Sequence, residues 1–401
     1  MSGRISTVGM YSSSLAAMLQ QQSQVARTQL QLSSNSKLLS AADDPVGAGM
    51  GVMLDRANAE LARYATNASS VQSRLNLEET ALSSVGDRIA RIKTLAIEAS
   101  NDSQSPEDRA DIAAELKQQY DGLVALANST DGAGRYLFGG TNDATAPFAK
   151  AAGGVSYSGD QTQRSVDISG SVSVGDSDPG SSVFMSITTG NGTFAARANA
   201  TNSGTTTLDA ATLANPAAWD GGTYKVSFDG AGNYQVTDSS STVISSGAYT
   251  PGTAIQFRGV SLTFNGAPNA GDSFSVKPSG SQDLFTSLQN LINAATAPSA
   301  TAAQKAAQRN GFFSSMEDID QVENHMLSVR ANVGARLNTI DATATERDSQ
   351  TVSLKSQLSD LRDLDYTEAA SRLSLQMTAL QAAQQTFQRI QGSSLFDYLR
   401  N

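Results

Sequence analysis

The feature that most constrains the fold of this chain is a heptad pattern of apolar residues from about residue 329 to residue 401. Its positions recur in steps of three and four residues, with Arg347 and Thr351 as the only polar ones in the first run, and a break at Asp365-Tyr366 separates two runs. The first run comprises Val333, Leu337, Ile340, Ala344, Leu354, Leu358 and Leu361, and the second comprises Leu373, Met377, Leu380, Ala383, Phe387 and Ile390, followed by Leu395, Phe396, Tyr398 and Leu399. This spacing predicts helices that pack along a partner helix.

A second pattern of the same kind lies at the opposite end of the chain. Its stepping positions are Val8, Tyr11, Leu15, Met18, Gln22, Val25, Gln29 and Leu32. The residues around them are mostly Gln, Ser and Ala, and long helices of this kind take most of their stability from packing. We therefore expect the two terminal segments to become ordered together, or against neighbouring copies of the chain.

Two further helices are predicted in the first third of the chain. Asp44-Pro45 fits the N-cap and first position of one helix, whose seam spans residues 50–99 and contains a single charged residue, Glu78. Ser105-Pro106 begins another helix that ends near residues 130–132, so the two helices form an antiparallel hairpin. Three glycines near the start of the first helix either admit a close neighbouring backbone or leave its first turns frayed: Gly47, Gly49 and Gly51.

The pattern changes between about residues 135 and 278, where Gly, Ser, Thr, Asn and Asp predominate. Short alternating segments separated by turn residues predict antiparallel β structure at residues 164–168, 224–228, 234–237, 261–264 and 273–277. Residues 201–207 are expected to form a loop. A helical pattern returns at residue 282, is interrupted at Pro298, and continues from about residue 302 to the end.

The predicted fold class is therefore mainly α with an inserted β-rich domain, in which both chain ends form a long antiparallel α-helical coiled-coil rod. We expect residues 1–40 with 366–401 to form a terminal helical domain and residues 41–134 with 282–365 to form a long-helix rod domain. Residues 135–281 are expected to form the β-rich insert, at the end of the rod opposite the termini.

Composition and motifs argue against several classes of function. The chain has 401 residues, a net charge of −10, no cysteine and one histidine, His325. Nucleic-acid binding needs a basic patch, and no apolar run approaches the ~20 residues of a membrane span. One histidine without cysteine leaves no His/Cys metal site and disfavours a catalytic dyad. Phosphate-loop and G-x-S-x-G motifs are absent from the sequence. We predict no nucleic-acid or membrane partner, and neither a catalytic residue, a metal nor a cofactor.

Several separated motifs resemble the flagellin family, and they occur in the order found there. They are Arg4-Ile5-Ser6-Thr7, residues 29–34 and Ser40-Ala41-Ala42-Asp43-Asp44-Pro45 near the N-terminus, Tyr136-Leu137-Phe138-Gly139-Gly140-Thr141, Tyr157-Ser158-Gly159-Asp160 and residues 265–274 around the insert, and Leu364-Asp365-Tyr366 and residues 394–399 near the C-terminus. The later motifs resemble the family members found at the hook–filament junction. Ser34-Asn35-Ser36-Lys37 departs from the Ser-Gly-Lys of the family at a turn, and residues 180–255 carry no recognised motif.

The resemblance implies a structural protein of the bacterial flagellum, located outside the cell and exported unfolded by the flagellar type III apparatus without a cleaved signal peptide. It implies self-association as a short ring, with a neighbouring hook-associated protein on the hook side and flagellin on the filament side. It also implies an export chaperone bound to the C-terminal helix. The terminal helices would form an inner tube, the long helices an outer layer, and the β-rich domain the exposed surface.

The assembly interface is expected to use the apolar residues of the two terminal segments, because a pair of helices leaves much of its apolar surface uncovered. These residues are Val8, Tyr11, Leu15, Met18, Val25, Leu32, Leu373, Met377, Leu380, Phe387, Ile390, Leu395, Phe396 and Tyr398. Two alternatives stay open. One is a flagellin-type subunit of the filament itself, which the ending Phe-Asp-Tyr-Leu-Arg-Asn disfavours. The other is a secreted adhesin, binding protein or enzyme that acts through the β-rich insert.

Overall fold

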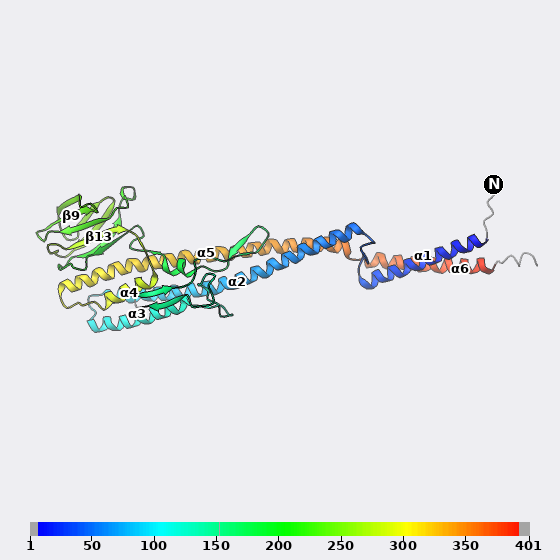
Figure 1. Ribbon diagram of the computed structural model, residues 1–401, viewed down its shortest axis with the longest axis horizontal. Coiled ribbons are helices and arrows are strands. Elements are labelled where there is room, and N and C mark those ends of the chain that lie inside the picture. Colours follow the sequence, from blue (N-terminus) through cyan, green and yellow to red (C-terminus); the bar gives the residue numbers. More distant parts are fainter. Residues whose placement is uncertain (1–6, 152, 393–401) are drawn as a thin grey trace, which may run out of the picture. The chain divides into compact units, whose positions relative to one another are not determined.

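The computed structural model describes residues 7–151 and 153–392. The chain divides into two compact units. The terminal unit comprises residues up to 66 and residues from 343 onward, and the central unit comprises residues 67–342. The predicted fold class is confirmed, because long helices at both ends of the chain flank a central β-rich insert (Figure 1).

The described residues form six α-helices: α1 (Thr7–Ser34), α2 (Pro45–Ser100), α3 (Pro106–Ala127), α4 (Leu284–Ala295), α5 (Ala302–Arg362) and α6 (Tyr366–Gly392). The strands are β1 (Phe148–Ala151), β2 (Gly154–Tyr157), β3 (Ser165–Asp167), β4 (Ser173–Gly175), β5 (Ile187–Thr188), β6 (Phe194–Ala198), β7 (Thr207–Leu213), β8 (Tyr224–Phe228), β9 (Asn233–Asp238), β10 (Val243–Ala248), β11 (Ala254–Phe257), β12 (Val260–Asn265), β13 (Ser273–Pro278) and β14 (Ser281–Gln282). A π-helical turn, η1 (Ser181–Met185), precedes β5, and a 3-10 turn, η2 (Pro216–Ala218), precedes β8.

The predicted helix starts are confirmed by their capping hydrogen bonds. The Asp44 carboxylate accepts from the backbone N–H groups of Val46 and Gly47 at 3.1 and 2.9 Å, so it caps α2. Ser105 and Asp108 form a reciprocal capping box at the start of α3. A short connection joins α2 to α3, and the two helices pack as the predicted antiparallel hairpin, with Arg88 and Arg91 of α2 bonded to Gln119 and Glu115 of α3.

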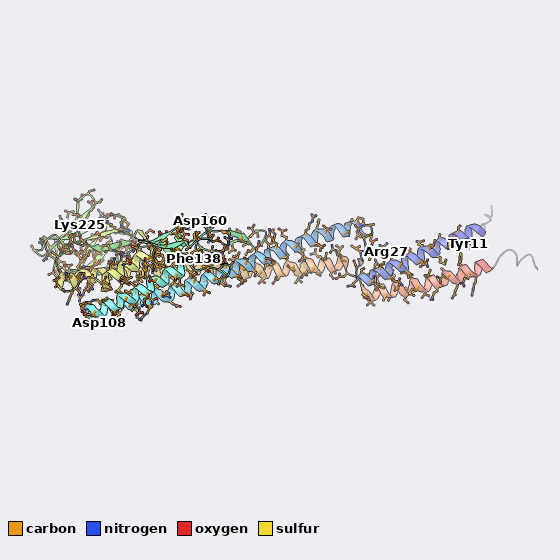
Figure 2. All side chains as sticks on the ribbon, turned by 60° about the horizontal axis from the view of Figure 1, so that its bottom comes forward. Tyr11, Arg27, Asp108, Phe138, Asp160 and Lys225 are labelled. Atoms are coloured by element: carbon orange, nitrogen blue, oxygen red, sulfur yellow. The ribbon has the colours of Figure 1, made fainter. Side chains whose placement is uncertain are left out.

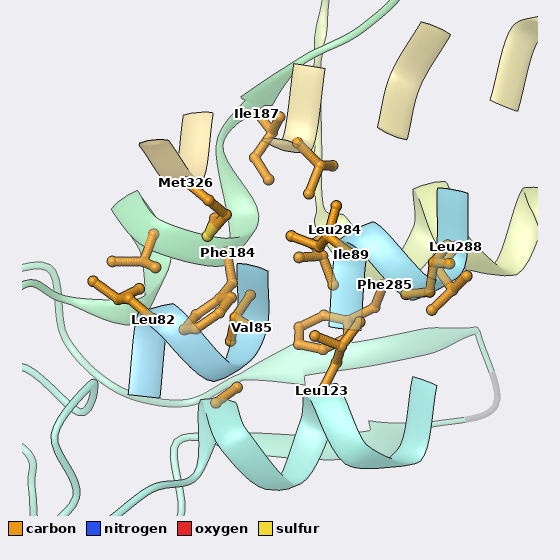
Figure 3. Packing of buried hydrophobic residues seen from close by; sticks show 14 of the residues in the cluster. Leu82, Val85, Ile89, Leu123, Phe184, Ile187, Leu284, Phe285, Leu288 and Met326 are labelled. Carbon is orange, nitrogen blue, oxygen red and sulfur yellow. The ribbon is translucent and has the colours of Figure 1, made fainter. Parts of the chain in front are cut away.

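The core of the central unit lies where α2, α3, α4 and α5 meet β1, β2 and η1. Phe184 of η1 and Phe285 of α4 are fully buried there, with 6.2 Å between their ring centroids. Leu82 and Ile89 of α2 and Leu123 of α3 surround these rings (Figure 3). The helices and the first part of the insert therefore share one core.

The β-rich insert contains a five-stranded sheet in the order β10-β9-β8-β13-β6 and a three-stranded sheet in the order β11-β12-β7. All strand pairs are antiparallel. The two sheets share a second core, in which Phe194, Phe264 and Phe274 are fully buried. The five predicted strand segments correspond to β3, β8, β9, β12 and β13. The sequence did not indicate the other strands, which are β1, β2, β4, β5, β6, β7, β10, β11 and β14.

Side chains of α5 form hydrogen bonds with backbone groups and with one arginine of the insert. Asn310 accepts a hydrogen bond from the N–H of Leu208 at 2.8 Å. The Asp318 carboxylate accepts from the N–H of Gly190 at 2.8 Å and from the guanidinium of Arg197 at 2.6 Å. Asn310 and Asp318 are buried, so these bonds are shielded from water and position the insert on the helix.

Glu317, next to Asp318, gives this contact a pH dependence. Burial raises the pKa of Glu317 from 4.5 to about 7, against the opposing charge of Arg197 at 3.5 Å. Between these two pH values the folded protein holds a proton that the unfolded chain has lost. The free energy of unfolding therefore falls as the pH rises from 4.5 to about 7.

Glu317→Gln should remove this fall and stabilise the protein at pH 8 by roughly 1–2 kcal/mol, after allowance for partial screening by solvent. The measurement is urea unfolding at pH 5 and pH 8, followed by the fluorescence of Trp219 in the insert. Glu115→Gln is the control, because the pKa of Glu115 is lowered by Arg91 rather than raised. A variant that keeps the wild-type difference between the two pH values would contradict the assignment.

Within the terminal unit, two glycines of α2 lie against side chains of α5. A Cβ atom at Gly47 would clash first with the capping carboxylate of Asp44 and would lie 3.2 Å from the Leu361 side chain, and one at Gly51 would lie 2.9 Å from the Arg362 guanidinium. Both glycines are buried. The first turns of α2 are helical, but the atoms beside both glycines belong to side chains, so the expected close approach of another backbone is not seen at these two positions.

The α2 seam differs from the prediction at one position. Met50 is exposed, so its assignment to the seam is wrong, because Gly47, Gly51 and Leu54 occupy the face toward α5. The other predicted seam positions of α2, from residue 54 to residue 99, are buried or half-buried. Gly49 faces outward, with no atom within 4 Å of the Cβ it lacks.

Candidate assembly surface of the terminal unit

The two terminal helices, α1 and α6, pack against each other in antiparallel orientation (Figure 1). Tyr11 of α1, labelled in Figure 2, lies 5.0 Å from Phe387 of α6 between ring centroids. Nearer the middle of the pair, the Thr28 hydroxyl donates to the Gln376 side-chain carbonyl at 2.8 Å, and Thr28 is buried. The prediction that the two ends of the chain order together is confirmed for the described residues of these helices.

The seam between α1 and α6 contains polar as well as apolar residues. The less exposed positions are Ser14, Met18, Gln21, Val25, Thr28, Gln31 and Leu32 in α1, and Ala369, Leu373, Gln376, Leu380, Ala383 and Phe387 in α6. The carbonyl oxygen of the Gln21 side chain is buried and has no hydrogen-bond partner. Buried polar groups contribute less to stability than packed apolar ones, so this seam holds the pair weakly.

The predicted assembly residues differ in where the structure places them. Met18, Val25, Leu32, Leu373, Leu380 and Phe387 line the seam, Tyr11 is exposed but contacts Phe387, and Leu15 and Met377 are exposed. The assignment of Leu15, Gln22, Gln29 and Met377 to the seam itself is wrong, because the seam uses the neighbouring positions 14, 21, 28 and 376 instead. Val8 and Ile390 belong to α1 and α6, and Leu395, Phe396 and Tyr398 lie outside the described residues.

Exposed apolar side chains concentrate in the terminal unit. Among the described residues, thirteen of the seventeen exposed large hydrophobic side chains lie there, although the central unit has more than twice as many residues. Three of them on the terminal helices were not predicted: Leu19, Leu30 and Leu375. The sequence could have indicated them, because they are large apolar residues outside the heptad positions of otherwise polar helices.

The connection from α1 to α2 is held against the end of α5. The N–H of Lys37 donates to the carbonyl of Arg362 at 2.7 Å, and the backbones of Ser36 and Asp363 form an isolated antiparallel β-bridge. Arg27 of α1, labelled in Figure 2, forms an ion pair with Asp43 at 2.7 Å. Hydrogen bonds from the backbone N–H groups of Leu39 and Ser40 help hold the pKa of Asp43 below its ordinary value.

Asn35 occupies the position at which the sequence departs from the Ser-Gly-Lys pattern. Its φ angle is 51°, in the left-handed region that favours glycine. Asparagine tolerates this region better than most residues, so the turn is retained without glycine.

The described residues offer little for chemistry. Within residues 7–151 and 153–392, no helix meets the length and hydropathy needed to span a bilayer, and no cluster of acidic or histidine side chains has the arrangement of a metal site. The Nε2 atom of His325 lies 2.8 Å from the carbonyl oxygen of Ser182, so this side chain joins α5 to η1. The exposed apolar surface of the terminal unit is thus the strongest candidate for function.

Three family models match the sequence. The bacterial flagellin N-terminal helical region matches residues 5–143, and the bacterial flagellin C-terminal helical region matches residues 316–399. The D2-like domain of flagellar hook-associated protein 1 matches residues 197–278, which include the end of β6 and all of β7 to β13. This last match covers most of the segment in which no motif was recognised.

Among the proteins of known identity that resemble this chain are flagellar hook-associated proteins. Flagellar hook-associated protein 3 of Escherichia coli (strain K12) is 26% identical over 98% of both chains. The crystal structure of FlgL from Xanthomonas campestris is 45% identical with a TM-score of 0.72, covering 76% of this chain and 99% of that one. The flagellar junction protein FlgL from Legionella pneumophila is 30% identical with a TM-score of 0.71, covering 78% of this chain and all of that one. The resemblance to the flagellin family is confirmed: the protein is a structural component of the bacterial flagellum, and the chain belongs to the family of flagellar hook-associated protein 3, FlgL.

Proposed function

We propose that the protein is the structural adaptor at the hook–filament junction and that copies assemble there as a ring through α1 and α6. The observation that carries this proposal is the concentration of exposed apolar side chains in the terminal unit. Leaving such surface in water is unfavourable, and neighbouring subunits would bury it. A ring needs two different faces on each subunit, which a helix pair with apolar residues on several sides supplies.

The arrangement of the terminal pair supports assembly rather than a self-sufficient bundle. Polar Ser14, Gln21 and Thr28 are turned into the seam, while Leu19 and Leu375 are turned away from it. Because the pair leaves these leucines uncovered, it gains stability when a further helix packs against them.

The proposed neighbours are a hook-associated protein on the hook side and flagellin on the filament side. In this assembly residues 1–40 with 366–401 form the inner tube, residues 41–134 with 282–365 form the outer layer, and residues 135–281 form the exterior surface. In this proposal the protein reaches its position outside the cell by flagellar export, and an export chaperone covers the apolar residues of α6. The role is structural rather than enzymatic.

The test is seeded assembly scored by electron microscopy. Purified protein is added to isolated hooks that carry the preceding hook-associated protein, with and without flagellin. A short cap that stops growing and that flagellin then extends is the expected result. Long filaments made by this protein alone would assign it to the filament, and no binding to the hooks would refute assembly through the terminal helices.

Leu380→Asp or Phe387→Asp should block assembly while the long helices stay folded, because either change places a charge in the α1–α6 seam. The helical circular dichroism signal at 222 nm should fall by no more than the part that α1 and α6 contribute. Gln381→Asp is the control on the same helix, since Gln381 is already polar and exposed. Normal junction formation by the Leu380 and Phe387 variants would contradict this expectation.

A further inference from the structure

An apolar stripe on α2 is turned away from every other helix of its unit. Val46, Met50 and Met53 are 79%, 50% and 62% exposed, and their spacing of four and three residues places them on one face of the helix. Gly49 belongs to the same face, with open space where its side chain would be. Glycine is among the poorest helix formers, and no contact within the described chain accounts for it here. Arg56, one turn beyond Met53, is exposed and forms no ion pair with any described residue.

The outer face of α5 carries a complementary set of residues in the same unit. Val352 is 68% exposed. Asp348, one turn before it, is exposed and forms no ion pair with any described residue. Ser356, one turn after it, is small and exposed. This face therefore presents one apolar side chain between an unpaired carboxylate and a small residue.

We propose that the outer face of α2 packs antiparallel against the outer face of α5 in an adjacent copy of the chain. When Met53 is set opposite Val352, the opposite directions of the helices bring Arg56 to Asp348 and Gly49 to Ser356. The first pair matches charges across the contact, and the second allows the backbones to approach closely. A single alignment thus satisfies an apolar, an ionic and a steric requirement.

The same chain cannot supply this contact. Within one copy, α2 and α5 already meet through their other faces, and Gly51 lies against Arg362. In that alignment Met53 is opposite residues near 360, about eight residues or roughly 12 Å along α5 from Val352. The two outer faces differ from each other, so the contact is heterologous, as a ring requires. The inference rests on the proposed function, because it assigns a second surface to the same assembly.

Charge reversal tests the pairing in the seeded assembly described above. Arg56→Asp and Asp348→Arg should each reduce incorporation roughly tenfold, and the double variant should recover to within about threefold of the wild type. Arg91→Asp is the control, because Arg91 is an exposed arginine of the same helix whose partner, Glu115, lies in its own chain. Wild-type assembly together with normal incorporation of both single variants would overturn the inference and leave the proposed function intact. Failure of the wild type itself would overturn the proposed function and this inference with it.

Cysteine cross-linking tests the alignment directly, because the natural chain has no cysteine. Assembled Met53→Cys/Val352→Cys protein should give disulfide-linked chains of three or more copies after mild oxidation. The control Met53→Cys/Gln357→Cys moves the second thiol to an exposed position on another face of α5, and it should give at most a trace of such chains. Equal ladders from both double variants, or none from either, would overturn the alignment.

Discussion

Arg74→Met should lower the free energy of unfolding by about 1.5–3 kcal/mol, because it removes hydrogen bonds made by a mostly buried charge. The Arg74 side chain is 10% exposed and donates hydrogen bonds to Asp131 at 3.0 Å and to the carbonyl of Tyr136 at 3.1 Å. Asp143 and Asp176, both nearly buried, lie 4.0 and 3.8 Å from the guanidinium. Methionine fills a similar volume without the charge, so Asp131 loses its arginine partner, whereas Asp143 and Asp176 keep their ion pairs with Arg135 and Arg164.

Arg91→Met provides the matched control on the same helix. Arg91 pairs with Glu115 at 2.7 Å, but its side chain is 47% exposed. Exposed pairs of this kind contribute little to stability, because solvent screens the two charges. Urea unfolding of the full chain, followed by circular dichroism at 222 nm, compares the two variants. Equal losses would mean that the cluster around Arg74 contributes no more stability than a surface ion pair.

The cluster around Arg74 illustrates what sequence could not predict. Its partners lie 57 or more residues away, and no local pattern indicates which carboxylates meet which arginine. Glu78 is a related case. The seam pattern marked it as a lone charge, but it accepts a hydrogen bond at 3.1 Å from the N–H of Asp178, which is 100 residues away in sequence. Burial, reinforced by the charge of Asp178, raises the pKa of Glu78 well above its ordinary value.

Features that depend on neighbours within four residues were predicted well. The caps at Asp44 and Ser105 are local hydrogen bonds, and strands such as β8 and β13 alternate regularly. β7 and β10 were not predicted because each has a shift in register with its partner strand, near Phe264 and Val243, and such a shift interrupts the alternation of inward and outward side chains. In β6 the inward side of the strand includes Ala196, which gives little contrast with the outward side.

The sequence also did not predict which face of α1 packs against α6. The predicted and observed stripes share Met18, Val25 and Leu32, but hydrophobicity assigns Leu15 to the seam, where the structure places Ser14. A helix that carries apolar residues on two sides does not indicate which side its own chain covers. The hydrogen bond between Thr28 and Gln376 contributes to that choice, and it is polar. The family resemblance supplied the functional assignment, but not these contacts.

Leu19→Asp and Leu375→Asp should each abolish seeded assembly without changing the helix content of the monomer. The two leucines are 56% and 72% exposed, so neither change removes a packed contact from the folded subunit. In the assembly, each substitution would forfeit about 1.5–3 kcal/mol of apolar burial per leucine and would also bury a carboxylate without a partner. The resulting loss should exceed a hundredfold in incorporation.

Leu327→Asp separates a site-specific effect from a general effect of surface charge. Leu327 is 55% exposed on α5 but belongs to the central unit, so its variant should assemble like the wild type. The comparison with Leu380→Asp adds a second distinction. That variant should lose circular dichroism signal because it disrupts the α1–α6 pair, whereas Leu375→Asp should fail to assemble with its signal intact. If Leu375→Asp assembled normally, or if Leu327→Asp failed equally, the outward leucines would not form the assembly surface. Failure of Leu375→Asp with full helix content would show that these helices must bind neighbouring subunits as well as fold.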